Sequence, residues 1–150
     1  MKPKLTKKEL GALRAVRDML DTGLIERNRP TTGIWIRDHI ALAMKRIFDM
    51  SIPLKTTNCG TVACIGGWTG AMMGMSPANA ENFVTNYNEG GKFHELFYPV
   101  YNSKLTAHYG KIKPEHAVKA IDNFLATGNP NWMKVLPVEL RKYARQKDTD

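Results

Sequence analysis

The segment from Asn58 to Met75 constrains the fold of this chain most, because it is rich in glycine and carries no charged residue. It holds both of the 2 cysteines, one of the 3 tryptophans and five of the 12 glycines. The uncharged stretch extends on both sides of it, from Lys55 to Glu81. A glycine-rich helix without a charged face is expected either to pack inside the protein or to form a site.

Helical periodicity divides this segment into a smooth side and a bulky side. Gly66, Gly70 and Gly74 recur every four residues and form one row of small residues. The larger side chains lie on the other side: Cys64, Ile65, Trp68 and Met72. Each glycine costs about 1 kcal/mol relative to alanine inside a helix, so we expect another helix to pack closely on the smooth side and offset that cost. The segment is therefore predicted to be the central helix of the fold.

A membrane-spanning helix is the alternative interpretation of this uncharged stretch. Polar residues such as Asn58, Thr61 and Thr69 and the scarcity of large aliphatic side chains disfavour it. The first residues, MKPKLTKKE, lack the apolar core of a signal peptide. We therefore expect a soluble, cytoplasmic protein without a membrane partner, in which Cys59 and Cys64 are thiols.

The rest of the sequence predicts short helices and no sheet. Thr6 and Glu9 form a capping box at the start of the first helix, and Gly23 ends it. Apolar periodicity with proline or glycine at the ends predicts further helices over about residues 36–50, 77–87, 93–98, 114–127 and 137–147. The fold class we predict is all-α: residues 1–150 form a single compact domain of six or seven short helices around the central glycine-rich helix.

The net charge of +8 is concentrated at the two ends of the chain. Residues 1–46 carry eleven basic and five acidic groups, and residues 101–150 carry nine and five. Basic ends are typical of proteins with an anionic partner, either nucleic acid or an acidic protein surface, although basic helix faces also serve solubility alone. Tyr143 lies within the C-terminal group, and arginine beside aromatic residues is typical of surfaces that contact phosphates and bases. The candidate binding residues are Arg14, Arg17, Arg27, Arg29, Arg37, Arg141, Lys142 and Arg145.

Candidates for catalysis are few, namely Cys59, Cys64 and His94. A cysteine near a helix N-terminus is expected to have a lowered pKa, because the helix dipole favours the thiolate. Catalysis by a thiol also needs a histidine and a group that orients it, and buried structural thiols are more common. The spacing of the cysteines and the lack of a tight histidine pair disfavour zinc, so we expect no metal and no cofactor.

Four segments carry a resemblance to other sequences: Phe48–Met50, Cys59–Trp68, Leu96–Tyr98 and Ala117–Gly128. Together they resemble short bacteriophage and bacterial proteins of uncharacterised function that share a Cys-Gly-Thr-x-x-Cys-Ile-x-Gly block. The similarity covers roughly residues 47–132 and is most specific at the cysteine block. This chain departs from it in Gly67 and Trp68, where many such sequences have another small or polar residue. The resemblance implies a phage-type accessory protein of the host cytoplasm, and it implies no activity.

The leading hypothesis is that the protein acts by binding through its basic helix faces. The partner would be a host protein that it inhibits, or nucleic acid. One alternative is a cysteine-dependent hydrolase or transferase that uses Cys59 or Cys64. Of the two, a binding protein is the one we expect. Another alternative is a virion or assembly component, in which the apolar helix packs against copies of itself.

Overall fold

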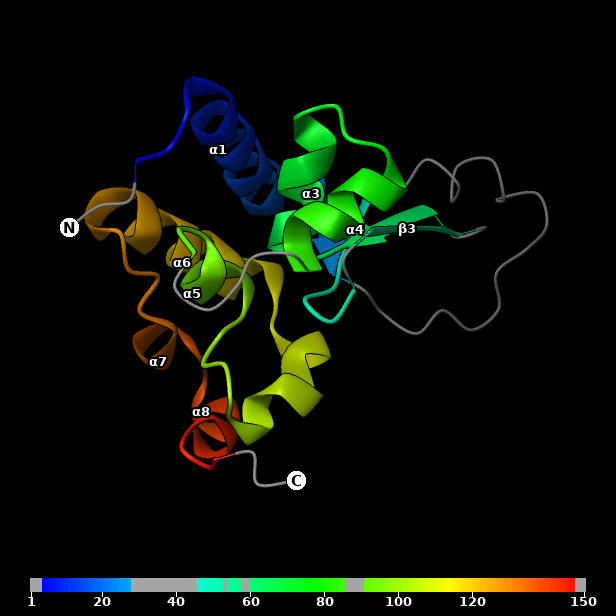
Figure 1. Cartoon of the computed structure of the whole chain (residues 1–150). Coiled ribbons are helices and arrows are strands. Elements are labelled where there is room, and N and C mark those ends of the chain that lie inside the picture. Colours follow the sequence, from blue (N-terminus) through cyan, green and yellow to red (C-terminus); the bar gives the residue numbers. More distant parts are fainter. Residues whose placement is uncertain (1–3, 28–45, 53, 58–59, 86–90, 148–150) are drawn as a thin grey trace.

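The computed structural model describes residues 4–27, 46–52, 54–57, 60–85 and 91–147 (Figure 1). Helices dominate these residues, which confirms the predicted helical fold class. The helices are α1 (Lys7–Thr22), α3 (Ile65–Met72), α4 (Pro77–Thr85), α5 (His94–Phe97), the 3₁₀ helix η2 (Lys104–Lys111), α6 (Pro114–Thr127), α7 (Trp132–Val135) and α8 (Val138–Ala144). The strands are β1 (Glu26–Arg27), β2 (Arg46–Phe48), β3 (Leu54–Thr57) and β4 (Gly60–Ala63).

The prediction that no sheet forms is wrong, because the four short strands make one mixed sheet. Its order is β1-β2-β4-β3, in which β3 and β4 pair antiparallel while β2 runs parallel to both β1 and β4. The end of the helix predicted over residues 36–50 therefore lies in β2, and residues 28–45 lie outside the described part. Strands of two to four residues are too short to show an alternating pattern, although Thr56, Thr57, Thr61 and Val62 are of the β-branched type that strands favour.

The first helix begins and ends where its sequence predicts. Thr6 Oγ1 accepts a hydrogen bond from the Glu9 amide at 3.1 Å, and the Glu9 carboxylate accepts one from the Thr6 amide at 2.9 Å. Gly23 follows the helix in the left-handed region at φ +82°, which glycine adopts without strain. The buried side of α1 packs against α6 and α3, so this helix anchors the N-terminus to the core.

The glycine-rich segment divides into a strand and a helix, instead of forming one helix from its start. Cys64 separates β4 from α3, and its Sγ accepts a hydrogen bond from the Gly67 amide at 3.3 Å as the N-cap. Residues 65–70 are buried, and α3 packs against α1, α4 and α5, which confirms that this helix is central. Met72, which the periodicity grouped with the larger side chains, is 38% exposed and does not belong to the core.

The smooth side of α3 faces a neighbouring helix, α4, as predicted. Two of the three glycines in the row make this contact. A Cβ on Gly66 would lie 2.8 Å from Val84 Cγ2, and a Cβ on Gly70 would lie 3.2 Å from the Cβ of Ala80. Gly74 instead follows α3 at φ +83°, and no atom lies within 4 Å of the position that a Cβ would take there, so this glycine serves the turn and not the packing. Two glycines therefore allow α3 and α4 to approach closely.

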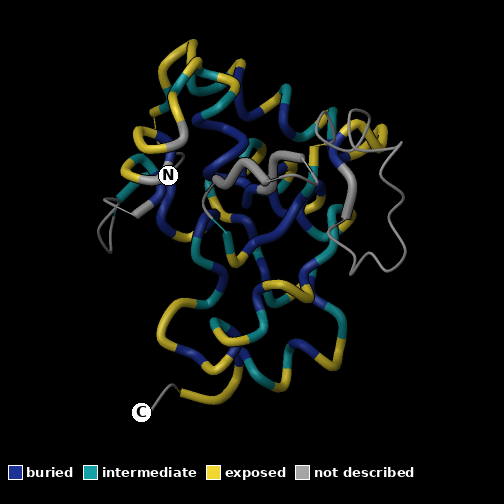
Figure 2. Tube along the Cα trace, turned by 90° about the vertical axis from the view of Figure 1, so that its right-hand side faces the viewer, coloured by how far each residue is buried: buried dark blue, intermediate teal, exposed yellow. Residues whose placement is uncertain are grey.

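The core extends from α3 through the phenylalanines to α6. Figure 2 shows buried stretches of the chain running through the middle of the molecule. The rings of Phe93 and Phe97 stack at 4.9 Å between centroids, and Phe93 also lies 6.0 Å from Phe124 of α6. At the opposite end of the molecule from α1, the last helix α8 packs against η2 (Figure 1). The backbone of Lys104 donates to the carbonyl of Gln146, and Ser103 pairs with Lys147, so the start of η2 is joined to the C-terminal end of the fold.

Candidate functional site

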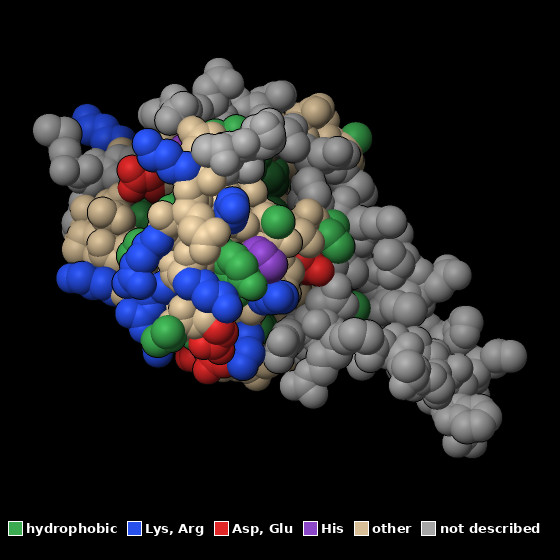
Figure 3. All heavy atoms as spheres, turned by 90° about the horizontal axis from the view of Figure 1, so that it is seen from below, with side chains coloured by type: hydrophobic (Ala, Val, Ile, Leu, Met, Phe, Trp, Pro, Cys, Tyr) green, Lys and Arg blue, Asp and Glu red, His purple; other side chains and the backbone are tan. Residues whose placement is uncertain are grey.

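Basic side chains gather on the face formed by η2 and α8. Residues 104–111 and 138–147 contain six basic groups and one acidic group, Glu139. Figure 3, which views the molecule from the side of these two elements, shows Lys and Arg side chains spread over this face. The members of what we call the η2–α8 face are Lys104, His108, Lys111, Arg141, Lys142, Tyr143, Arg145 and Lys147. The positive potential of so many neighbouring cations attracts anions.

An aromatic pair lies among these cations. The imidazole of His108 stacks on the ring of Tyr143, with 3.7 Å between centroids and 18° between planes. The amino groups of Lys142 and Lys111 lie 5.0 and 6.0 Å from the centroid of the Tyr143 ring. Both aromatic side chains are half-buried, so part of the stacked pair is open to solvent. Flat rings surrounded by amines offer stacking and charge neutralisation at one place.

The C-terminal candidates from the sequence are all part of this face. Lys142 and Arg145 are exposed, whereas Arg141 is half-buried. The Nε atom of Arg141 is buried without a hydrogen-bond partner among the residues that the structure describes. Its guanidinium therefore packs against the fold along one edge, while Lys142 and Arg145 present their charge to solvent.

The N-terminal candidates do not join this face. Arg14 is exposed on α1, at the far end of the molecule (Figure 1). Arg17 donates from Nε and Nη2 to the two carboxylate oxygens of Asp122 in α6, at 2.8 and 3.1 Å, and from Nη1 to Asp18 and Asp21. Hydrogen bonds with Asp122 and Asp18 raise the pKa of Arg17 above its ordinary value.

Arg17 is thus a structural link between α1 and α6 and is already neutralised. Arg27 lies in β1, where the structure describes its backbone and not its side chain. Arg29 and Arg37 lie outside the described residues. Of the two basic ends of the chain, the C-terminal one therefore forms the better defined anion-attracting surface.

Cys64 differs from the expectation for a cysteine at a helix N-terminus. Its side chain is buried, and burial raises its pKa to about 11, although the amides of Gly67 and Gly66 act in the opposite direction. Desolvation of the thiolate outweighs the favourable helix terminus, so Cys64 is a neutral thiol at neutral pH. The predicted lowering of its pKa is wrong. Cys59 lies outside the described residues.

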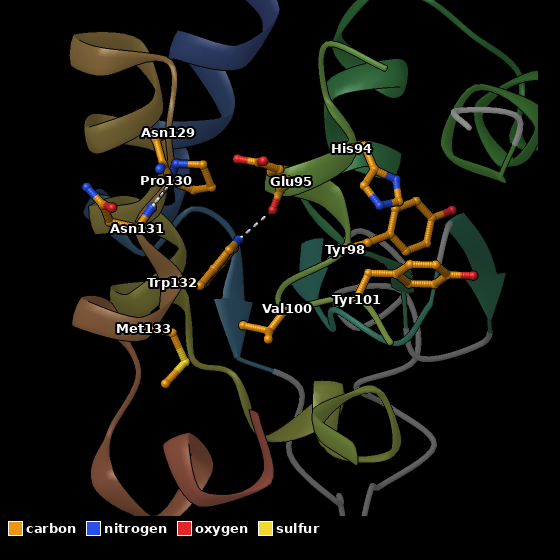
Figure 4. Close-up of a pocket in the computed structure, with 10 residues that line it drawn as sticks. All are labelled: His94, Glu95, Tyr98, Val100, Tyr101, Asn129, Pro130, Asn131, Trp132 and Met133. Carbon is orange, nitrogen blue, oxygen red and sulfur yellow. Dashed lines mark hydrogen bonds between the residues drawn. The ribbon is translucent and has the colours of Figure 1, made fainter. Parts of the chain in front are cut away.

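A second feature is a pocket of about 380 Å³ between α5 and α7. Figure 4 shows its walls coming from two segments that are distant in sequence, residues 94–101 and 129–133. His94, Tyr98 and Tyr101 form one aromatic cluster, with ring centroids 5.1 to 5.9 Å apart. Trp132 comes from the other segment and donates from Nε1 to the carbonyl of Glu95 at 2.9 Å. We call this the His94–Trp132 pocket.

The walls of the pocket are held in an unusual backbone conformation. Val100 has φ +44° and Asn131 has φ +52°. Asparagine tolerates the left-handed region, whereas a β-branched valine in it is strained, at a cost of about 1–3 kcal/mol. Hydrogen bonds from Ser103 Oγ to the Val100 carbonyl, at 2.6 Å, and from the Tyr109 hydroxyl to the Pro99 carbonyl, at 2.8 Å, hold the strained turn.

A buried polar atom without a hydrogen-bond partner lies in the wall of the pocket. His94 is 8% exposed, and its Nδ1 has no hydrogen-bond partner among the described residues. A buried nitrogen without a partner costs about 1–3 kcal/mol, so most proteins avoid one. The sequence indicated His94 only as a candidate for catalysis by a thiol, and it gave no reason to place His94 beside Trp132. Their common pocket follows from the packing of α5 against α6 and α7, which no local pattern reveals.

Comparisons with protein-family models, with curated proteins and with solved structures find no match to this chain. Within the described ranges, no three His, Cys, Asp or Glu side chains are placed to hold a metal ion. None of the described helices has the length and apolar character needed to cross a membrane. Function is therefore inferred from the η2–α8 face and the pocket.

Proposed function

We propose that the protein binds single-stranded nucleic acid through the η2–α8 face. The observation that carries this proposal is the stacked pair of His108 and Tyr143 among the amines of Lys111 and Lys142. Proteins that bind single strands combine cations along the phosphates with aromatic rings on which bases stack. An acidic protein surface would also use the cations, but bases stack on aromatic rings in most proteins that bind single strands, so the pair favours a strand.

The resemblance of the Cys59–Trp68 block to short phage proteins supports placing this binding in an infected host cell. A host protein with an acidic surface is the other partner that the charge would suit. Recovery of partners from a lysate with and without nuclease separates the two: loss of the captured material after nuclease treatment supports a strand, and retention of one protein contradicts it.

A matched pair of double variants tests where the strand binds. Lys142→Gln with Arg145→Gln removes two exposed charges from the η2–α8 face, and Lys7→Gln with Arg14→Gln removes two exposed charges from α1. Both pairs lower the net charge equally. Fluorescence anisotropy of a labelled single-stranded oligonucleotide should show weakening on the order of tenfold for the first pair at low salt, and little change for the second. Equal weakening by both pairs would contradict a localised site.

A further inference from the structure

We propose that the His94–Trp132 pocket binds one nucleobase. Resting on the function proposed above, we further assign this base to the strand that the η2–α8 face holds. The shared chemistry is a flat heterocycle with a hydrogen-bonding edge, and a free nucleoside would present the same chemistry as a base within a strand.

The size and the walls of the pocket suit a flat ring. Its volume of about 380 Å³ lies in the range of pockets that take small ligands, about 300–1,000 Å³. The lining includes Tyr98 and Tyr101 from one segment and Trp132 from the other, together with apolar Val100 and Pro130. Figure 4 shows the two tyrosine rings beside His94, and Trp132 on the other side of Val100. Proteins that take an unstacked base place it against such side chains. Tyr101 is 49% exposed, so part of its ring is open to solvent at the pocket.

Polar groups in the pocket match the edge of a base. The Asn129 side-chain oxygen accepts a hydrogen bond from the backbone N–H of Asn131 at 2.8 Å. The NH₂ group of Asn129 can therefore donate elsewhere. The Asn131 side chain brings a second amide, a group that can donate and accept at once. His94 also lines the pocket, but its Nδ1 is buried in the wall and is not exposed to an entering base. Amides of asparagine form paired hydrogen bonds with base edges in many complexes.

The charged group that lines the pocket is a carboxylate, which disfavours a phosphate inside the pocket. The phosphates of a strand are therefore expected to stay outside. Among the described residues that line the pocket, Glu95 is the one Asp, Glu, Lys or Arg. A carboxylate beside the opening repels an anion, so the base and not the phosphate is expected to enter. A quaternary ammonium group is the competing occupant, because aromatic rings near a carboxylate suit cations too. The asparagine amides favour the base.

The chain connects the pocket directly to the basic face. Tyr101 precedes Lys104 of η2 by three residues, which limits their Cα separation to about 11 Å. Met133 is followed at once by Lys134, two residues before the turn into α8. A strand on the η2–α8 face therefore passes within reach of the pocket, and the strained turn at Val100 fixes the position of Tyr101 relative to η2.

Two variants test the pocket without disturbing the core. Tyr101→Ala removes the half-exposed ring, and Asn131→Gly removes an amide while keeping the left-handed backbone conformation. The intact protein is titrated with uncharged adenosine, cytidine, guanosine and uridine and with choline, followed by tryptophan fluorescence. Titration with at least one nucleoside should reach saturation. Tyr101→Ala should weaken the binding of that nucleoside about tenfold, and Asn131→Gly should change the order of preference among the four nucleosides. Saturation by choline and by no nucleoside would overturn the proposal, as would unchanged binding to Tyr101→Ala.

Oligonucleotides distinguish the two sources of the base. Wild-type protein should bind a single strand more tightly than an abasic strand of equal length. Tyr101→Ala should reduce that preference about tenfold and leave the part that stacking on the η2–α8 face contributes. The double variant Lys142→Gln/Arg145→Gln should keep nucleoside affinity while it binds the strand about tenfold more weakly at low salt. Nucleoside binding without any strand binding would overturn the function proposed above and leave the pocket as a site for a free nucleoside. Strand binding that Tyr101→Ala leaves unchanged would overturn the pocket and leave the η2–α8 face.

Discussion

Replacing Gly66 by alanine should test the close approach of α3 and α4, which is the packing on which the whole fold depends. A Cβ at this position would lie 2.8 Å from Val84 Cγ2 and 2.9 and 3.0 Å from two ring carbons of Phe97. All three atoms belong to buried side chains, which cannot move away freely. Overpacking of this kind costs about 1–3 kcal/mol, whereas alanine gains about 1 kcal/mol over glycine in helix propensity. The net change should be between no effect and a loss of about 2 kcal/mol.

Gly11→Ala provides the matched control, since Gly11 lies inside α1 and no atom lies within 4 Å of the added Cβ. This variant should gain the same propensity of about 1 kcal/mol without any steric cost. The two variants should therefore differ by about 1–3 kcal/mol in the free energy of unfolding, or by several degrees in Tm. Urea unfolding followed by tryptophan fluorescence measures both. Stabilisation of Gly66→Ala equal to that of Gly11→Ala would refute the packing of α3 on α4.

Three single interactions can be tested in the same way. Asp122→Asn should lower the Tm, and the loss should shrink at high salt, because the variant breaks the ion pair with Arg17 between α1 and α6; a loss independent of salt would argue against that cause. Thr6→Ala should cost about 1 kcal/mol in unfolding free energy through loss of the N-cap, measured by denaturant titration, and an unchanged midpoint would contradict the cap. In a Cys59→Ser background, Cys64 should react with iodoacetamide at pH 7 only as fast as the protein unfolds. Because burial raises the pKa of Cys64 from 9.0 to about 11, its contribution to stability is present below pH 9 and disappears as the pH rises to 11, so wild-type protein should lose more stability over that interval than Cys64→Ala.

Much of the helical fold follows from local signals in the sequence. The capping box at Thr6, the left-handed glycines Gly23 and Gly128, and the proline at the start of α6 place the ends of α1 and α6 correctly. These signals work because they satisfy backbone groups at helix ends, which depends on a few neighbouring residues. The packing of Gly66 and Gly70 against α4 also follows from their spacing, since small residues four apart share one side of a helix.

The sheet and the sites depend instead on residues that are distant in sequence. The pairing of β2 with β4 gains its stability from neighbouring strands, and no strand among the described residues is long enough for a local pattern. The raised pKa of Cys64 depends on burial under other elements, which outweighs the local helix terminus. The C-terminal basic cluster and Tyr143 were visible in the sequence, whereas His108 became part of the same surface only through the packing of η2 on α8.

The salt dependence of strand binding tests the central claim most directly, namely that the cations of the η2–α8 face neutralise phosphates. For a single strand, the logarithm of the association constant falls with the logarithm of salt concentration by about 0.7 per phosphate neutralised. If the six cations of residues 104–111 and 138–147 all engage, the slope should be about −4. Lys142→Gln/Arg145→Gln should reduce its magnitude by about 1.4, and Lys7→Gln/Arg14→Gln should leave it unchanged. A slope near zero in the wild type, or the same slope in the first variant, would contradict the proposed function.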